Sequence, residues 1–191
     1  MDKTTRIISG ILKGKKLAIP PADITRPSSD RTKEAVFSVL ESELMISGRT
    51  WQNILFLDCF SGSGAMAAEA LSRGAYYVAL AEKSLEAQKI IRRNLSYFPP
   101  EYQQKYIIYG DVFALPAAKK PADIIFTDAP YEQGLTEKAL SFLLKKGWIA
   151  PHTFIATEVE NKELLPIPSG FTLIKEKTYG RAKVLFLQYN Q

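Results

Sequence analysis

The sequence predicts an α/β domain built on an open, doubly wound sheet of mostly parallel strands. Several strand-like apolar runs each lead to an acidic residue, and the first of them is followed by a glycine-rich loop and a helix. That order is typical of domains that bind nucleotide cofactors at the carboxyl ends of their strands. With 191 residues, 46% of them hydrophobic, the chain can bury one good core and is expected to form one main domain.

The N-terminal segment predicts a small extension before that domain. Residues Arg6–Gly10 and Lys15–Ile19 are expected to pair as a short hairpin, because glycines occupy the loop between them and two prolines end the second strand. We assign residues 1–27 to this extension and residues 28–191 to the main domain, which includes the helix that follows.

The positive charge of the chain is concentrated at this end. Residues 1–33 hold eight basic and three acidic residues, so the whole net charge of +5 lies there and the remainder is neutral. A basic segment beside a neutral domain favours nucleic acid as a partner over an ordinary solvated basic face. The candidate phosphate-binding residues are Lys13, Lys15, Lys16, Arg26 and Arg31.

A helix of about four turns is predicted next. Ser28 or Ser29 suits its N-cap, and Asp30 suits the positive end of its dipole. Its apolar stripe consists of Ala35, Val36, Val39, Leu40 and Leu44. We expect this stripe to pack on the main domain, with Phe37 in the core, and to bring Arg26 and Arg31 towards the cofactor edge.

The next three elements form a cofactor-binding pattern. Asn53–Asp58 is strand-like, Cys59–Gly64 is a loop, and a helix follows over Ala65–Leu71. Gly62 and Gly64 lack a Cβ atom, so the backbone can approach a ligand closely. The helix N-terminus adds free N–H groups and partial positive charge.

This loop does not by itself identify the cofactor. Residues 62–67 also fit the dinucleotide pattern, and Glu82, after the strand Tyr76–Ala81, lies where a nicotinamide enzyme binds its ribose hydroxyls. Asp58 favours S-adenosylmethionine, because a carboxylate there would attract a methionine ammonium and repel a pyrophosphate. A hydride-transfer enzyme also usually needs a second domain, for which the chain has little room.

A third strand, Tyr106–Tyr109, also favours S-adenosylmethionine. It leads to Asp111, which could accept a hydrogen bond from the adenine amine, while Val112 and Phe113 could supply apolar contacts. Phe60 and Lys83 complete the predicted cofactor set, to which Asp128 is added from the next strand.

The fourth strand, Ile124–Thr127, ends in the tetrapeptide Asp128-Ala129-Pro130-Tyr131. Pro130 stops the strand, since proline cannot donate to a ladder. Asp128 and the Ala129 carbonyl could accept hydrogen bonds from a planar exocyclic amine, and Tyr131 could stack on its ring. Alone, the tetrapeptide could equally be an ordinary turn, but the preceding motifs favour a catalytic role for these four residues.

The C-terminal third completes the sheet. A helix is expected over residues 135–146, a strand over 153–158, and a closing hairpin over 171–179 and 183–189.

Other classes of site are disfavoured by composition. One cysteine, Cys59, and one histidine, His152, make a disulfide or a zinc site implausible, so no metal is predicted. We interpret Cys59 as a small buried hydrophobe and His152 as a turn residue. No run of about 18 apolar residues and no secretory signal occur, so no membrane span and a cytoplasmic location are expected.

These residues resemble the RsmD-type methyltransferases, which act on small-subunit ribosomal RNA. The resemblance covers nearly the whole chain and rests on Arg6-Ile-Ile-Ser-Gly10 with Gly14-Lys15, Thr25-Arg26-Pro27 with Asp30-Arg31 and Glu34–Phe37, Leu57–Gly64, Glu69–Ala75, and Asp128–Tyr131. The N-terminal arginine motif and the Ser-Arg-Gly-Ala segment are its most specific parts.

The resemblance implies a class I methyltransferase fold, Rossmann-like and seven-stranded, with one antiparallel strand. It implies S-adenosylmethionine as cofactor and transfer of its methyl group to guanine N2. It carries cofactor roles onto Asp58, Gly62, Gly64, Glu82 and Asp111, and the target-base role onto residues 128–131. The expected substrate is ribosomal RNA within a small subunit, and the expected oligomeric state is a monomer.

One position departs from the family pattern, in which proline usually follows the aspartate of the tetrapeptide. Ala129 occupies that position here, so the backbone φ angle is no longer fixed, but the carbonyl remains. We therefore expect looser positioning rather than lost activity. The alternatives are an adenine-N6 methyltransferase acting on DNA or RNA, a nicotinamide oxidoreductase, and a non-catalytic RNA-binding protein.

Overall fold

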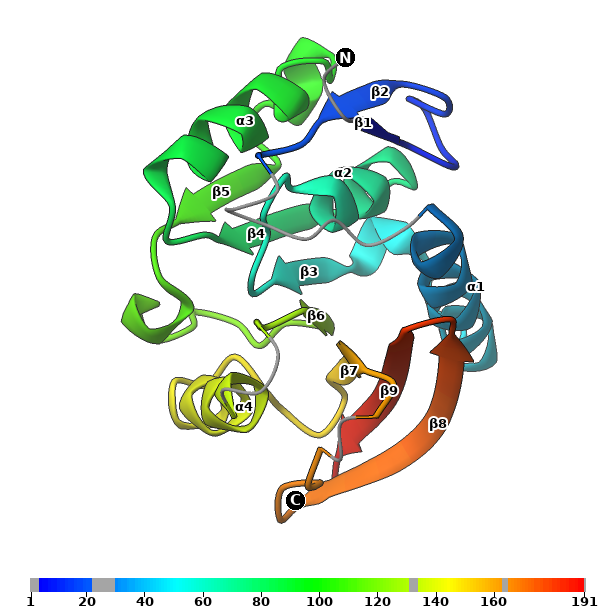
Figure 1. Ribbon diagram of the computed structural model, residues 1–191, viewed down its shortest axis with the longest axis vertical. Helices are drawn as coiled ribbons and strands as arrows, with labels where there is room; N and C mark the ends of the chain where they lie inside the picture. Colours follow the sequence, from blue (N-terminus) through cyan, green and yellow to red (C-terminus); the bar gives the residue numbers. More distant parts are fainter. Residues whose placement is uncertain (1–3, 22–29, 131–133, 163–164, 191) are drawn as a thin grey trace.

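A seven-stranded sheet forms the centre of the computed structural model, which describes residues 4–21, 30–130, 134–162 and 165–190. Its strands are β3 (Leu55–Asp58), β4 (Tyr77–Ala81), β5 (Tyr106–Tyr109), β6 (Ile124–Thr127), β7 (Phe154–Glu160), β8 (Phe171–Tyr179) and β9 (Ala182–Tyr189). They lie in the order β5-β4-β3-β6-β7-β9-β8, which Figure 1 shows from the top of the view to the bottom.

The strands from β5 to β7 are parallel, whereas β9 runs antiparallel to both of its neighbours. The order reverses between β3 and β6, and this is the switch point at which open α/β sheets bind ligands. The predicted fold, a mostly parallel doubly wound sheet with one antiparallel strand, is confirmed.

Helices cover both faces of the sheet and divide its core in two. The helices are α1 (Asp30–Ile46), α2 (Ala65–Ser72), α3 (Leu85–Leu95) and α4 (Leu135–Lys145), with short 3-10 turns η1 (Trp51–Asn53), η2 (Pro100–Tyr102) and η3 (Val112–Ala114). Apolar residues of α1, α2 and α3 pack on one face around Phe56 and Phe126, and those of α4 pack on the other around Leu57 and Ile125. The alternation along β3 and β6 follows from the two-residue period of a strand.

Phe37 is fully buried in the core that contains Phe56 and Phe126. None of the helices in the described ranges is long and apolar enough to cross a membrane.

The N-terminal hairpin pairs β1 (Thr4–Arg6) with β2 (Lys16–Ala18) and packs on the helices α2 and α3 (Figure 1). The hairpin is confirmed, but its bounds differ: β1 shares only Arg6 with the predicted strand Arg6–Gly10, and β2 is shorter than Lys15–Ile19. The first strand ends at Arg6 because the N–H groups of Ile8 and Ser9 donate to the Glu69 carboxylate at 2.7 and 3.0 Å instead of to a partner strand. The boundary expected between residues 27 and 28 lies outside the described residues, as do Ser28 and Ser29.

The family-specific segment Glu69–Ala75 fastens this hairpin to the domain. The Ser72 hydroxyl donates to the Ser9 carbonyl at 2.7 Å and accepts from the Leu12 N–H at 3.0 Å. Gly10 lies so close to α2 that a Cβ atom would fall 1.8 Å from the Ser72 carbonyl oxygen, and its φ of +82° also favours glycine. These residues therefore have a structural role.

Replacing Glu69 with alanine is expected to destabilise the fold by about 3 kcal/mol, because it leaves the part-buried N–H groups of Ile8 and Ser9 without an acceptor and the Arg73 guanidinium with Glu41 alone. Glu41 provides a matched control, since it pairs with the same arginine but its side chain is 48% exposed, against 0% for Glu69. Glu41→Ala should cost less than about 1 kcal/mol. Urea unfolding measures both, and equal losses would show that burial does not distinguish the two carboxylates.

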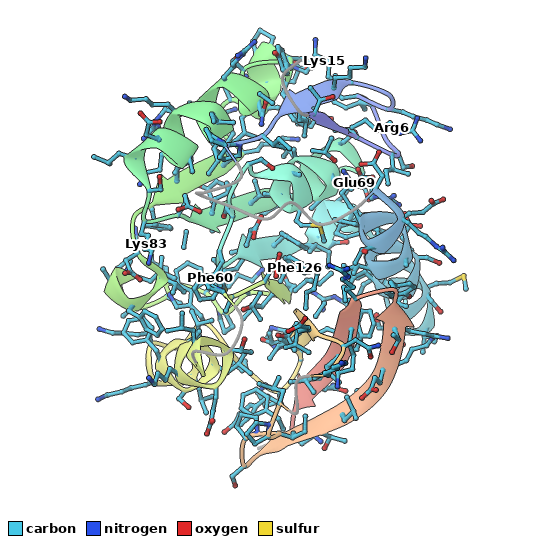
Figure 2. All side chains as sticks on the ribbon, in the orientation of Figure 1. Arg6, Lys15, Phe60, Glu69, Lys83 and Phe126 are labelled. Atoms are coloured by element: carbon cyan, nitrogen blue, oxygen red, sulfur yellow. The ribbon has the colours of Figure 1, made fainter. Side chains whose placement is uncertain are left out.

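The start of α1 differs from expectation. Asp30 accepts hydrogen bonds from the Thr5 hydroxyl and pairs with Arg6 at 3.2 Å, and the buried Lys33 ammonium donates to the Arg6 carbonyl at 2.6 Å. Figure 2 shows Arg6 on the side of the molecule away from Phe60 and Lys83. The helix therefore anchors β1 and does not bring Arg31 towards the cofactor edge. Arg26 lies outside the described residues.

Candidate active site at the carboxyl ends of the strands

Four acidic residues lie at the ends of four adjacent parallel strands. In spatial order they are Asp111 after β5, Glu82 after β4, Asp58 as the last residue of β3, and Asp128 after β6. Because parallel strands end at the same edge of a sheet, the fold brings these four positions to one edge. The sequence predicted all four as site residues.

Asp58 is a buried carboxylate with an open position. It is 1% exposed, and the N–H of Ala67 in α2 supplies a hydrogen bond to it. Its Oδ2 atom has no hydrogen-bond partner among the described residues. Burial and, to a smaller extent, the nearby Glu82 carboxylate raise the pKa of this carboxyl to about 7, although the Ala67 hydrogen bond opposes the rise. An orphaned, buried carboxylate oxygen fits a cationic ligand.

Glu82 connects the glycine loop to the end of β4. Its Oε2 atom accepts from the Gly62 N–H at 2.8 Å, and its Oε1 atom accepts from the Ser84 N–H at 2.8 Å. The Gln88 side chain supports the same turn by donating to the Glu82 carbonyl at 2.7 Å. The carboxylate is thus fixed by backbone donors, with further lone pairs available to hydroxyl groups such as those of a ribose.

The glycine loop requires residues without side chains. Gly64 precedes α2 with a φ of +73°, and a Cβ atom there would lie 3.2 Å from the Ile91 side chain and 3.3 Å from that of Leu80. Gly62 also has a positive φ, of +53°. The loop therefore presents backbone at this edge, next to the N-terminus of α2.

The remaining predicted cofactor residues flank these carboxylates. The Asp111 side chain caps η3 by accepting from the Phe113 N–H at 2.9 Å, and Val112 is buried. Figure 2 shows Phe60 and Lys83 on the same side of the molecule. The structure thus places Asp111, Val112, Phe60 and Lys83 near the carboxyl edge, and their roles in binding stay predictions.

The tetrapeptide begins directly at the end of β6. Asp128 is half-buried, Ala129 is buried and Pro130 is exposed, while Tyr131 lies outside the described residues. The next described helix, α4, begins at Leu135, so the segment leads from the strand to a helix on the opposite face from α2. Because β6 pairs with β3 in parallel and Phe126 lies opposite Asp58, Asp128 follows at the switch point beside Asp58.

The three lysines of the N-terminal hairpin lie away from the carboxyl edge of the sheet. Lys13, Lys15 and Lys16 are exposed, and the Lys15 ammonium lies 3.8 Å from the centre of the Tyr97 ring.

Cys59 is buried, and burial together with the Asp58 charge raises the pKa of its thiol. It is therefore a poor nucleophile, as its interpretation as a small hydrophobe implied.

Helix α3 and Asn94 were missed by the sequence analysis. The Ser84 hydroxyl caps α3, and Ala87, Ile91 and Leu95 then recur at four-residue intervals on its buried face. This cap and this spacing are the signal that could have identified the helix. Asn94 is buried, pairs with both backbone groups of Ala18 at 2.9 and 2.8 Å, and donates to the Ser63 carbonyl at 2.9 Å. It links the hairpin to the glycine loop.

Comparison with known proteins shows the family of this chain. The model of a family described as conserved hypothetical protein 95 matches residues 5–188. The ribosomal RNA small subunit methyltransferase D of Buchnera aphidicola is 34% identical over 172 residues, which are 90% of this chain and 86% of the relative. The protein of the same name from Haemophilus influenzae is 33% identical over 178 residues, 92% of this chain and 89% of the relative.

A solved structure agrees with these sequence matches. A putative methyltransferase from Escherichia coli superimposes with a TM-score of 0.80 at 29% identity, and the match covers 98% of this chain and 99% of that one. The similarity therefore includes the N-terminal hairpin, the sheet and the carboxyl edge.

Proposed function

This chain belongs to the family described as conserved hypothetical protein 95, the RsmD family, and we propose that it transfers a methyl group from S-adenosylmethionine to the exocyclic N2 of a guanine in small-subunit ribosomal RNA. The observation that carries the proposal is the row of four acidic residues along one edge of the sheet: Asp111, Glu82, Asp58 and Asp128. The chain that bears them is 34% identical to a ribosomal RNA small subunit methyltransferase D. The nicotinamide alternative finds no support in these relatives.

The residues at the edge fit the proposed cofactor. Asp58 would bind its ammonium through the unpartnered Oδ2 atom, Glu82 would accept from its ribose hydroxyls, and Asp111 would accept from its adenine amine. Gly62 and Gly64 would let the cofactor approach the loop backbone. When bound, S-adenosylmethionine supplies a methyl group that its sulfonium has already activated for transfer.

The tetrapeptide residues would prepare the acceptor. The lone pair of the guanine amine is delocalised into the ring, so this nitrogen is a weak nucleophile. Hydrogen bonds from the amine to Asp128 and to the Ala129 carbonyl would favour a more tetrahedral nitrogen whose lone pair points at the methyl group. Asp128 would then take the departing proton, a contribution of about 10²–10⁴-fold. Tyr131 would stack on the target base, worth roughly 1–3 kcal/mol.

Transfer of labelled methyl from S-adenosylmethionine to small ribosomal subunits that lack the modification tests the proposal. After digestion to nucleosides, label is expected in N2-methylguanosine. Label in N6-methyladenosine would replace the proposed base by adenine. An absence of label, despite measurable binding of S-adenosylhomocysteine, would reject the small subunit as the substrate.

A further inference from the structure

We propose that the exposed face of α3 is a second RNA-docking surface, which carries the sugar-phosphate backbone between the N-terminal hairpin and the active-site edge; this inference rests on the proposed function. Its residues are Lys89, Arg92 and Arg93, and we call them the α3 track. In the sequence, the excess of positive charge lies at the N-terminus, away from residues 89–93. The fold places α3 beside the N-terminal hairpin (Figure 1), and this brings the two groups of basic residues together.

The α3 track is a single face of a helix. Lys89 is three and four residues from Arg92 and Arg93, which places all three on neighbouring positions of the helix surface. All three are exposed, while Ala87, Ile91, Asn94 and Leu95 face the core. Glu86 is the one acidic residue on the exposed side of α3, and it lies in the first turn, where it suits the helix dipole.

The N-terminus of α3, which precedes the α3 track, lies at the candidate active site. The N-cap residue Ser84 donates its N–H to the Glu82 carboxylate at 2.8 Å, and Lys83 lies between them in the chain. The helix then runs 11 residues, about 16 Å, away from the carboxyl edge.

The C-terminal end of the α3 track meets the hairpin. Asn94 forms hydrogen bonds with the N–H and the carbonyl of Ala18 in β2. Tyr97 follows Arg93 by four residues, and the Lys15 ammonium makes a cation–π contact with its ring. Figure 1 shows α3 extending from the strand ends to the hairpin. The hairpin lysines and the α3 track therefore form one basic surface that ends at the cofactor edge.

The cations of this surface differ from the structural cations of the protein. Arg6, Lys33, Arg49 and Arg73 each pair with a carboxylate. Among the described residues no ion pair involves the α3 track or the three hairpin lysines. Unpaired, exposed cations in a row fit a regularly spaced polyanion, and phosphates bound by them release counterions.

The experiment compares two double charge reversals. Arg92→Glu with Arg93→Glu alters the α3 track, and Lys119→Glu with Lys120→Glu is the matched control, because these two lysines are also adjacent in the chain and exposed. The control pair precedes β6, between Ala118 and Ala122, which bond to Lys146 and Trp148 after α4. These residues pack with α4 on the opposite face of the sheet from α3. Both variants change the net charge equally.

Binding of each variant to protein-free small-subunit ribosomal RNA is measured across a salt series, with melting temperature and S-adenosylhomocysteine affinity as checks of the fold. The α3 variant is expected to bind about tenfold more weakly than wild type near 0.1 M salt, and its salt slope should fall by about 1.4–1.8 for two lost phosphate contacts. The control should stay within about twofold. Arg92→Gln with Arg93→Gln should show a smaller loss in the same direction, and it replaces the glutamate variant if that one does not fold.

Equal binding by the α3 variant and the control would overturn the proposal. So would an α3 variant that binds protein-free RNA like the control but methylates subunits poorly, because the α3 track would then contact a ribosomal protein. If the wild-type protein transfers no methyl group to RNA, the proposed function fails, whatever the two variants bind.

Discussion

Replacing Asp128 with asparagine is expected to lower the rate of methyl transfer by about 10²–10⁴-fold, because an amide cannot accept the proton that leaves the amine and presents a donor where an acceptor is needed. Asp128 lies at the carboxyl end of β6, beside the end of β3 that carries Asp58. Cofactor affinity is expected to change only a few-fold, since the other carboxylates and the glycine loop remain. Single-turnover transfer and calorimetric binding of S-adenosylhomocysteine measure the two effects.

Asp123 provides the control at the other end of the same strand. It is buried at the start of β6, pairs with Arg49, and accepts from the Leu55 N–H at 2.7 Å. Asp123→Asn should therefore lower the melting temperature while the transfer rate of the folded protein stays near that of wild type. A normal rate in Asp128→Asn would refute the catalytic assignment, and a lost rate in Asp123→Asn would show that the assay reports folding.

Replacing Asp58 with asparagine is expected to weaken S-adenosylhomocysteine binding by a factor of about 10² to several times 10³, which corresponds to the roughly 3–5 kcal/mol lost when one partner of a buried ion pair is removed. The loss arises at a carboxylate that is fully buried and has an unpartnered Oδ2 atom in the free protein. Isothermal titration gives the dissociation constant directly.

The pH dependence separates this role from a structural one. The pKa of Asp58 is raised to about 7 in the free protein, so below that pH the neutral carboxyl offers the ammonium no ion pair. Wild-type affinity should therefore fall as the pH drops below 7, by up to about tenfold per unit, whereas the weak binding of Asp58→Asn should not follow that curve. An identical pH profile in both proteins would exclude Asp58 as the group responsible.

Stability should change in the opposite direction to affinity. The folded pKa of Asp58 lies above its unfolded value of about 3.8, so the unfolded state loses its proton first. This group therefore favours the folded state least above pH 7, and its contribution declines as the pH rises from about 4 to 7. Asp58→Asn removes the buried charge, and its melting temperature at pH 8 should equal or exceed that of wild type.

Sequence predicted the sheet well because its strands are short apolar runs bounded by turn residues. The predicted bounds of β5 and β6 agree with the structure, and Asp58, Glu82, Asp111 and Asp128 lie where their strands end. Strand order places these acids side by side, and the sequence analysis did not predict that order. Their roles in binding and catalysis stay predictions, and Tyr131 lies outside the described residues.

Features that depend on long-range contacts were not predictable. The hairpin strands end early because Glu69, about 60 residues away, takes the donors of Ile8 and Ser9. The unpartnered Asp58 oxygen depends on how α2 covers the end of β3, which no local pattern reveals. Helix α3 was missed for a different reason, since its capping and spacing signals are present in the sequence.

The long-range hydrogen bonds that hold the N-terminal hairpin have a consequence for the order of events during synthesis. Ile8 bonds to a residue 61 positions later, and Ala18 bonds to one 76 positions later. The hairpin is therefore made first, but its docking is complete only after α3 has left the exit tunnel, and until then the N–H and carbonyl groups of Ala18 bond to water. A nascent chain that stops before Asn94 carries the lysines but holds them in no fixed geometry. The protein thus acquires a fixed arrangement of hairpin and helix only after more than half of its length has been translated.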